Sequence, residues 1–391
     1  MKRLLFFLLA LLSVFSYLTV FSLASDDESE GEVAQPTATA MEIDARGAIL
    51  IEASTGTVLF EQNADEAFPP ASVTKIMTLL LVMEALDAGR FTLSDRVPVS
   101  EHAASMGGSQ VFLSPGETLS VEEMIKCAVI SSANDAAVAL SEFVSGSEDA
   151  FVSEMNRRAG ELGMKNAHFE NVTGLDDTTV DHRCSARDIA LMSRALISHK
   201  DILKYSSTWM DSIRDGSFTL SNTNRLIRFY PGATGLKTGS TAKAKFCLSA
   251  TAERNGMTLI AVVMGSPSRD IRNEETKRLL DYGFAGYGLF SRNATELPPV
   301  KALGGESDFC RVGYEGTSAV VSRGEEGKIK TEIDLPDTLK APVAEGDVVG
   351  RAVFRSGENV VAEVPIKALE TVSRITFPAL FKKMLRALVL G

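Results

Sequence analysis

The sequence predicts a mixed α/β protein of the α+β type, in which helices cover both faces of one antiparallel sheet, followed by a small all-β domain. Two apolar hairpin patterns lie far apart in the chain and bracket a middle that is mostly helical. Because a sheet buries its faces against other elements, this order indicates one sheet closed by both ends of a helical segment. Beyond Arg292 the pattern changes to short β-like stretches separated by Gly, Pro and charged turns.

Each hairpin is marked by its turn. Residues 47–53 and 57–62 are apolar-rich and are joined by Ser54-Thr55-Gly56. Residues 245–254 and 257–265 flank Asn255-Gly256, which is a strong two-residue hairpin signal. We expect these strands to form the sheet of a domain that spans residues 41–290.

The helices follow from apolar periodicity. Residues 72–88 keep apolar side chains at helical spacing and stop at Gly89. Four more segments have helical patterns, near residues 121–130, 133–145, 149–162 and 185–198. The C-terminal β domain is expected at residues 293–366, with strands near 309–313, 318–322, 328–333, 347–354 and 359–365.

The N-terminus has the features of an export signal. Lys2 and Arg3 precede an apolar run, and the small residues of Ser22-Leu23-Ala24 end it. We expect a signal peptide at residues 1–24 and a flexible linker at residues 25–40. The alternative is an uncleaved membrane anchor, because the run is about long enough to span a bilayer.

The C-terminal segment, residues 369–391, predicts an amphipathic helix. One face carries apolar residues and the other carries clustered cations; these are Phe377, Leu380, Phe381, Met384, Leu385 and Leu388, and Lys382, Lys383 and Arg386. Such a helix suits an anionic membrane surface. The alternative is a terminal helix docked on the β domain.

Charge and composition exclude several classes of protein. The formal net charge is −11, and it becomes −13 without Lys2 and Arg3, so nucleic acid is not an expected partner. The four cysteines form no Cys-x-x-Cys pair and the four histidines form no His-Glu-x-x-His. We therefore expect no metal and no cofactor, and we expect buried thiols in preference to disulfides.

Three short polar motifs carry the predicted chemistry. They are Ser72-Val73-Thr74-Lys75, Ser132-Ala133-Asn134 and Lys237-Thr238-Gly239. A second Ser-x-x-Lys begins at Ser240 and a second Ser-x-Asn at Ser291, whereas Lys-Thr-Gly occurs once. Ser72 and Lys75 start a helix, where positions three apart are neighbours. Ser240 and Lys243 lie on or near a strand, where such positions point to opposite faces.

Each motif residue has an expected role. Ser72 is the nucleophile, and Lys75 is its base if burial, a helix N-terminus and Lys237 keep the amine partly neutral. Ser132 carries a proton between Lys75 and the leaving amine, and Asn134 orients the substrate amide. Helix capping is the alternative explanation for Ser132 and Asn134.

The third motif suits substrate binding. Lys237 and Thr238 supply a cation and a hydroxyl donor for a substrate carboxylate. Gly239 lacks a side chain, so substrate can lie close against that strand.

From about Gly47 to Phe284 the sequence resembles the low-molecular-weight penicillin-binding proteins, the serine-type D-alanyl-D-alanine carboxypeptidases of peptidase family S11. Besides the three motifs, the resemblance rests on Pro70-Ala71 before Ser72, on Phe169-Glu170-Asn171-Val172-Thr173-Gly174-Leu175, on Ser185-Ala186-Arg187-Asp188 and on Tyr282-Gly283-Phe284. It implies the transpeptidase fold that these proteins share with β-lactamases. One departure is Ala244-Lys245, where the family usually has Ala-Gly.

The resemblance also implies the reaction and its setting. Ser72 attacks the peptide between two terminal D-alanines of a peptidoglycan stem, and β-lactams acylate the same serine. Backbone N–H groups of Ser72 and Ser240 form the oxyanion hole by the family pattern. The expected location is the extracytoplasmic face of the bacterial cytoplasmic membrane.

Three alternatives share some of these features. A serine β-lactamase has the three motifs but needs a Glu-x-x-Leu-Asn segment, and none follows the Ser-x-Asn. Transpeptidase or endopeptidase action uses the same residues. A catalytically inactive wall-binding protein is disfavoured because Ser72, Lys75, Ser132 and Lys237 are all present.

Overall fold

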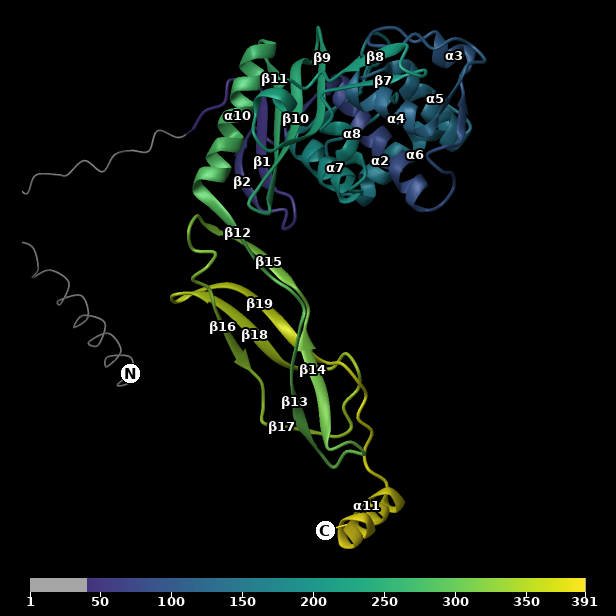
Figure 1. Cartoon of the computed structure of the whole chain (residues 1–391). Coiled ribbons are helices and arrows are strands. Elements are labelled where there is room, and N and C mark those ends of the chain that lie inside the picture. Colours follow the sequence, from purple (N-terminus) through teal and green to yellow (C-terminus); the bar gives the residue numbers. More distant parts are fainter. Residues whose placement is uncertain (1–40, 391) are drawn as a thin grey trace, which may run out of the picture. The chain divides into compact units, whose positions relative to one another are not determined.

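The computed structural model describes residues 41–390 (Figure 1). The predicted signal peptide, residues 1–24, and the predicted linker, residues 25–40, lie outside the described residues. Ile43 is the first residue of the buried core.

A five-stranded antiparallel sheet forms the centre of the first domain, in the order β2-β1-β11-β10-β9 (Figure 1). Both predicted hairpins are confirmed. The strands are β1 (Gly47–Glu52), β2 (Val58–Gln62), β9 (Ala233–Thr241), β10 (Lys245–Arg254) and β11 (Met257–Ser266). Gly47 of β1 pairs with Met264 of β11, so the two distant hairpins join into one sheet, as expected.

Helices pack on both faces of this sheet, as the sequence predicted. In Figure 1, α10 (Arg269–Gly286) lies on one side of the sheet, and α7 (Ala186–Ser198) lies on the other. The first domain has eight further helices among its described residues. They are η1 (Ala71–Thr74), α2 (Lys75–Asp87), α3 (Glu101–Ala104), α4 (Val121–Ile130), α5 (Asn134–Ser145), α6 (Glu148–Glu161), α8 (Ile202–Ser206) and α9 (Leu226–Phe229). Helix α2 runs through the core, and most of its side chains are buried on every side.

Three short two-stranded sheets lie in the segments that connect the helices. They are β3 (Ala67–Phe68) with β6 (Cys184–Ser185), β4 (Arg96–Pro98) with β5 (Thr118–Ser120), and β7 (Met210–Ile213) with β8 (Phe218–Ser221). The starts of α4 and α7 are fixed by capping boxes, Ser120 with Glu123 and Ser185 with Asp188.

The C-terminal strands form a six-stranded sheet in the order β16-β18-β19-β14-β13-β17 and a pair of β12 with β15. Their bounds are β12 (Tyr287–Arg292), β13 (Thr295–Leu303), β14 (Phe309–Tyr314), β15 (Thr317–Ser322), β16 (Lys330–Asp334), β17 (Thr338–Lys340), β18 (Val348–Ser356) and β19 (Asn359–Ala368). The strands have their own core, which includes Phe290, Cys310, Phe354 and Ile366.

Two differences from the predicted β domain have clear causes. Strand β13 was not predicted because it contains Pro298 and Pro299, which are typical of loops. The register of its pairing with β14 shifts at these prolines. The predicted end of the first domain, residue 290, falls within β12, residue 293 lies just after that strand, and residue 366 falls within β19, two residues before its end. Pairing between distant strands sets those ends, and the sequence alone does not show it.

The predicted tail, residues 369–391, contains two different structures. Val372 is buried and pairs with Val343, so the residues just after β19 belong to the β domain. Helix α11 spans Phe377–Leu390, and Phe377 is 80% exposed while Phe381 is 55% exposed. Among residues 41–390, no helix is long and apolar enough to cross a bilayer.

The four cysteines are buried free thiols, as expected. Burial raises the pKa of each thiol above its ordinary value. They therefore act as small apolar core residues.

Candidate active site

The predicted nucleophile lies on the short turn that leads into the central helix. Ser72 is half-buried in η1, and Lys75 is the first residue of α2. Lys75 Nζ donates a hydrogen bond to Ser72 Oγ at 3.0 Å. Ala71, just before the serine, has φ +49°, a strained conformation for a residue with a side chain. A rigid turn thus presents the hydroxyl directly to the amine.

Lys75 is completely buried and has three acceptors. Besides Ser72 Oγ, its Nζ donates to Asn134 Oδ1 at 2.5 Å and to Thr173 O at 2.9 Å. Burial is the main cause that holds the pKa of Lys75 well below its ordinary value; the charge of Lys237 lowers it further, and Asp135 opposes both. The amine can therefore be neutral and accept a proton near neutral pH.

Ser132 occupies the turn between α4 and α5, with φ +63°. Its Oγ accepts a hydrogen bond from Lys237 Nζ at 2.8 Å. The three acceptors of Lys75 do not include Ser132, so the predicted direct link from Lys75 to Ser132 is absent from the bonds of these described residues. The proton partner of Ser132 in this structure is Lys237.

Asn134 is buried and both ends of its amide contact the protein. Its Oδ1 accepts from Lys75, and its Nδ2 donates to Gly107 O at 2.7 Å. The adjacent Asp135 accepts the backbone N–H groups of Val111 and Leu113. The start of α5 thus positions both Lys75 and the loop beside it, a role that the prediction for Asn134 did not include.

Lys237, in the middle of β9, is also buried. Its Nζ donates to Ser132 Oγ and to Thr238 O, each at 2.8 Å. Burial, together with the nearby guanidinium of Arg272, lowers the pKa of Lys237 to about 7. Near neutral pH this amine is poised to give or take a proton.

The rest of the third motif lines the edge of the sheet. Thr238 Oγ1 donates to Thr223 Oγ1 at 2.7 Å, and Ser240 is exposed on the same edge strand. Gly239 also has a packing role that the sequence did not predict. A Cβ at Gly239 would lie 2.9 Å from each of three backbone atoms, Pro70 O, Ser72 N and Val73 N. Glycine is required there because the nucleophile turn itself packs against the strand.

The departure at Lys245 has a backbone explanation. Lys245 pairs with Thr241 across a three-residue hairpin loop, and it adopts φ +57°. A residue in the left-handed region is normal after such a loop and favours glycine. The glycine that the family usually has at this position therefore suits the left-handed conformation of the turn, and Lys245 adopts that conformation with some strain.

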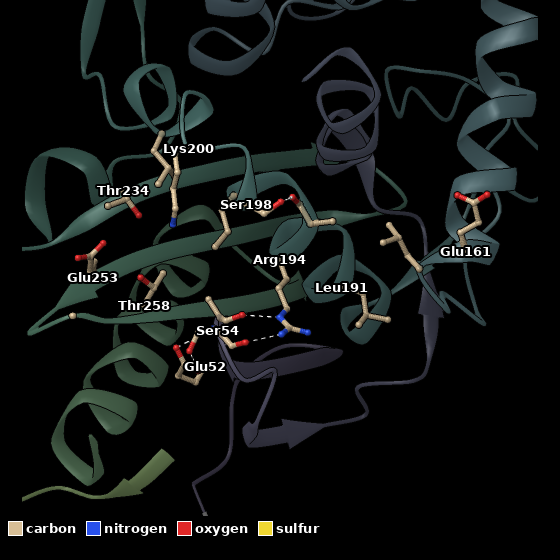
Figure 2. A pocket seen from close by; sticks show the side chains of 16 residues that line it. Glu52, Ser54, Glu161, Leu191, Arg194, Ser198, Lys200, Thr234, Glu253 and Thr258 are labelled. Carbon is tan, nitrogen blue, oxygen red and sulfur yellow. Dashed lines mark hydrogen bonds between the residues drawn. The ribbon is translucent and has the colours of Figure 1, made fainter. Parts of the chain in front are cut away.

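A large surface pocket of about 800 Å³ lies elsewhere on the same domain. Figure 2 shows Arg194 donating to the backbone beside Ser54, with Lys200, Glu253 and Thr258 around the opening. Its lining includes none of the eight predicted site residues. Within residues 41–390, no group of three or more His, Cys, Asp or Glu side chains is placed to hold a metal ion.

The structure thus brings the first two motifs and Lys237 into two hydrogen-bonded sets, Lys75 with Ser72 and Asn134, and Lys237 with Ser132. Thr238, Gly239 and Ser240 lie beside Lys237 on β9, and Gly239 packs against the turn that carries Ser72. Sequence reasoning missed four contributors: Asp135, Thr173, Thr223 and Arg272. Asp135 lies in the helix predicted near residues 133–145, and Thr173 lies in the segment 169–175 on which the family resemblance partly rests. Thr223 and Arg272 belong to no motif, and only the fold brings them to the site.

Comparisons with known proteins agree with this architecture. Residues 33–268 match the family model described as D-alanyl-D-alanine carboxypeptidase, and residues 292–374 match that of the penicillin-binding protein 5 C-terminal domain. The chain is 45% identical over 348 residues to D-alanyl-D-alanine carboxypeptidase DacF of Bacillus subtilis, covering 87% of this chain and 89% of that protein.

Solved structures give the same result. Penicillin-binding protein 5 of Haemophilus influenzae matches with a TM-score of 0.76 and 30% identity, covering 86% of this chain and 99% of that one. Penicillin-binding protein D2 of Listeria monocytogenes, solved in an ampicillin-bound form, matches with a TM-score of 0.57 and 32% identity, covering 62% and 98%. The second match covers less of this chain.

Proposed function

Because the chain belongs to the D-alanyl-D-alanine carboxypeptidases of peptidase family S11, we propose that it removes the terminal D-alanine of peptidoglycan stem peptides through an acyl-enzyme at Ser72. The observation that carries the assignment of the nucleophile is the bond from Lys75 Nζ to Ser72 Oγ, made by a completely buried lysine. The same attack on a strained lactam gives the covalent complex with β-lactams.

Acylation begins when neutral Lys75 takes the proton of Ser72 Oγ. The oxygen attacks the carbonyl carbon of the penultimate D-alanine and forms a C–O bond. The tetrahedral intermediate then expels the terminal D-alanine as its C–N bond breaks. Ser132 gives its hydroxyl proton to that amine. Protonated Lys237, whose Nζ lies 2.8 Å from Ser132 Oγ, then donates a proton to the serine oxygen. In this sequence Ser132 relays from Lys237, which modifies the role expected from its motif.

Deacylation reverses these transfers with water as the nucleophile. A water molecule attacks the ester carbon, and its proton returns through Ser132 to Lys237. The C–O bond to Ser72 breaks as Lys75 returns its proton to the serine oxygen. Both lysines end in their starting states, so the cycle is balanced.

Substrate binding uses the edge of β9. Lys237 and Thr238 suit the terminal carboxylate of the peptide; Thr238 Oγ1 donates its one proton to Thr223 Oγ1 without substrate and redirects it to the carboxylate in the proposed complex. The backbone N–H groups of Ser72 and Ser240 are proposed for the oxyanion. Gly239 supports the site indirectly, by letting the nucleophile turn approach the strand.

One experiment tests this function against its alternatives. The protein is incubated with a pentapeptide ending in D-Ala-D-Ala, and free D-alanine, cross-linked product and turnover of penicillin are measured in parallel. We expect D-alanine as the main product and a stable penicillin adduct that peptide mapping places on Ser72. Ser72→Ala should remove both, whereas Ser291→Ala, in the second Ser-x-Asn, should not. A label on another residue would overturn the assignment.

We further propose that the enzyme acts at the extracytoplasmic membrane surface through α11. The apolar residues Phe377, Phe381 and Met384 are exposed, and Lys382 supplies positive charge for anionic lipid, whereas Lys383 is paired with Asp308 of the β domain. Deleting residues 377–391 leaves Val372 and its pairing in place. The truncated protein should no longer pellet with anionic vesicles, but it should keep its activity on a soluble peptide. Continued pelleting with vesicles would refute the role of α11.

A further inference from the structure

A buried histidine outside the three motifs is bonded to the residue that precedes Lys75. His182 Nε2 lies 2.8 Å from Thr74 Oγ1, and both side chains are buried. The backbone N–H of Glu170 donates to His182 Nδ1 at 3.1 Å. Because Nδ1 accepts, the neutral ring carries its proton on Nε2 and donates it to Thr74. The ring therefore has one fixed tautomer and two partners.

Residues 170–182 form a segment that packs against η1, the turn that carries Ser72, and against the start of α2. Thr78 Oγ1 donates to Val172 O at 2.7 Å, and Lys75 Nζ donates to Thr173 O at 2.9 Å. Gly174 has φ +79°, and a Cβ there would lie 1.8 Å from Ala71 O. Three consecutive residues of the segment thus contact η1 or α2 directly.

The segment is also closed on itself beside the histidine. The Glu170 carboxylate accepts the backbone N–H groups of Val180 and Asp181, at 2.8 and 3.1 Å. Asn171 Oδ1 accepts the N–H of Gly174 at 2.7 Å, inside the same loop. His182 stands where the two ends of the loop meet, and its bond to Thr74 ties that junction to the nucleophile turn.

We propose that His182, through Thr74, is a positioning residue that holds the Thr173 carbonyl against Lys75 for acylation. The inference rests on the proposed function, because it gives Lys75 the role of base. When Lys75 accepts the proton of Ser72, a buried ammonium forms and needs acceptors for its N–H groups. Thr173 O and Asn134 Oδ1 are the two that do not change during the reaction. Displacing the carbonyl destabilises the protonated amine and slows the attack.

Burial keeps the ring of His182 neutral near neutral pH, although nearby carboxylates oppose it. Burial is the largest cause that lowers the pKa of His182, to about 4, and His168 lowers it as well. Glu170 and Asp176 face the ring and act in the opposite direction. Protonation would remove the Nδ1 acceptor of the Glu170 N–H, so the network is intact above the acidic range.

Two pairs of variants separate the bonds of the histidine. His182→Asn keeps an acceptor near the Nδ1 position and loses the donor to Thr74, whereas His182→Gln keeps an N–H donor near the Nε2 position. Thr74→Val removes the hydroxyl at nearly constant shape, and Thr74→Ser retains it. The readouts are the acylation rate constant with labelled penicillin, its pH profile, D-alanine release and the melting temperature.

We expect Thr74→Val and His182→Asn to slow acylation by about ten- to hundredfold and to shift the pH at which acylation becomes half-maximal. Thr74→Ser and His182→Gln should stay within about threefold of the parent rate. The double variant Thr74→Val/His182→Asn should be no slower than the worse single variant, because both changes break one bond.

Wild-type rates and an unshifted pH profile in Thr74→Val would overturn the proposal, and so would a lower melting temperature as its only effect. Thr74→Val is nearly isosteric, so it decides the question if His182→Asn does not fold. Failure of the proposed function has a different signature, since the unmodified enzyme would then acquire no label at Ser72.

Discussion

The substitution Gly239→Ala tests whether contact between β9 and the nucleophile turn sets the reactivity of Ser72. A Cβ at this position would lie 2.9 Å from Pro70 O, Ser72 N and Val73 N. Ordinary contact begins near 3.4 Å, so each approach is about 0.5 Å too short. All three atoms belong to the backbone, and no side-chain rotation can relieve the overlap. The turn must move away from the strand.

A displacement of this size acts on catalysis more than on stability. We expect a loss of about 1–3 kcal/mol in the free energy of unfolding, which is typical of an inserted methyl group. The acylation rate should fall by about ten- to hundredfold, because Ser72, with its hydroxyl and its backbone N–H, moves away from Ser240 on β9 and the proposed oxyanion hole widens. The assay is stopped-flow acylation by labelled penicillin, with urea unfolding of the same preparation.

Two glycines provide matched controls. Gly107 lies beside Asn134 and Gly160 lies in α6, and an added Cβ has no neighbour within 4 Å at either position. Gly107→Ala and Gly160→Ala should therefore acylate at the parent rate. Normal acylation by Gly239→Ala would refute the packing argument, as would an equal loss in the two controls.

Three further predictions concern single residues. Lys75→Ala should reduce acylation by about 10³-fold with the fold retained by circular dichroism, and near-normal labelling would exclude Lys75 as the base. The pKa of His182 is lowered from 6.5 to about 4, so the unfolded chain binds a proton that the native state resists. Stability present above pH 6.5 should thus be lost as the pH falls to about 4, by up to about 3 kcal/mol in urea titrations. His182→Gln should flatten this slope, and an unchanged slope in that variant would contradict the assignment to His182. Lys245→Gly should raise the free energy of unfolding by about 0.5–1 kcal/mol by relieving φ +57°. Asn255→Gly, at φ +53°, should gain less because asparagine tolerates this conformation; equal gains would contradict the strain argument.

The sequence determined the two hairpins and five helices of the first domain to within a few residues, but it did not predict the long helix α10 or the short helices α3, α8 and α9. Periodicity marks α4 because Glu122, Glu123 and Lys126 face away from its buried side, whereas α2 is marked by a long apolar run that stops at Gly89, because it is buried on every side. Asn255-Gly256 marks the second hairpin because few residue pairs tolerate its turn. The sequence concealed β13, because its two prolines resemble a loop and the sheet accommodates them by a shift in register.

The sequence by itself also determined the reactive groups, because serine, lysine and the Lys-Thr-Gly strand occur at spacings that local structure makes meaningful. It placed Lys75 beside Ser72, since residues three apart meet at the start of a helix. Only the tertiary structure decided which groups surround them. It pairs Ser132 with Lys237, brings Thr173 O to Lys75, and assigns Gly239 to the contact between strand and turn.

The physical reason lies in the range of the interactions. Local spacing fixes neighbours within one element, whereas the pKa of Lys75 depends on burial and on Lys237, which is far away in the chain. His182 illustrates the limit, because it belongs to no motif and reaches Thr74 across 108 positions of sequence. Such partners meet only when the helices and the sheet have packed.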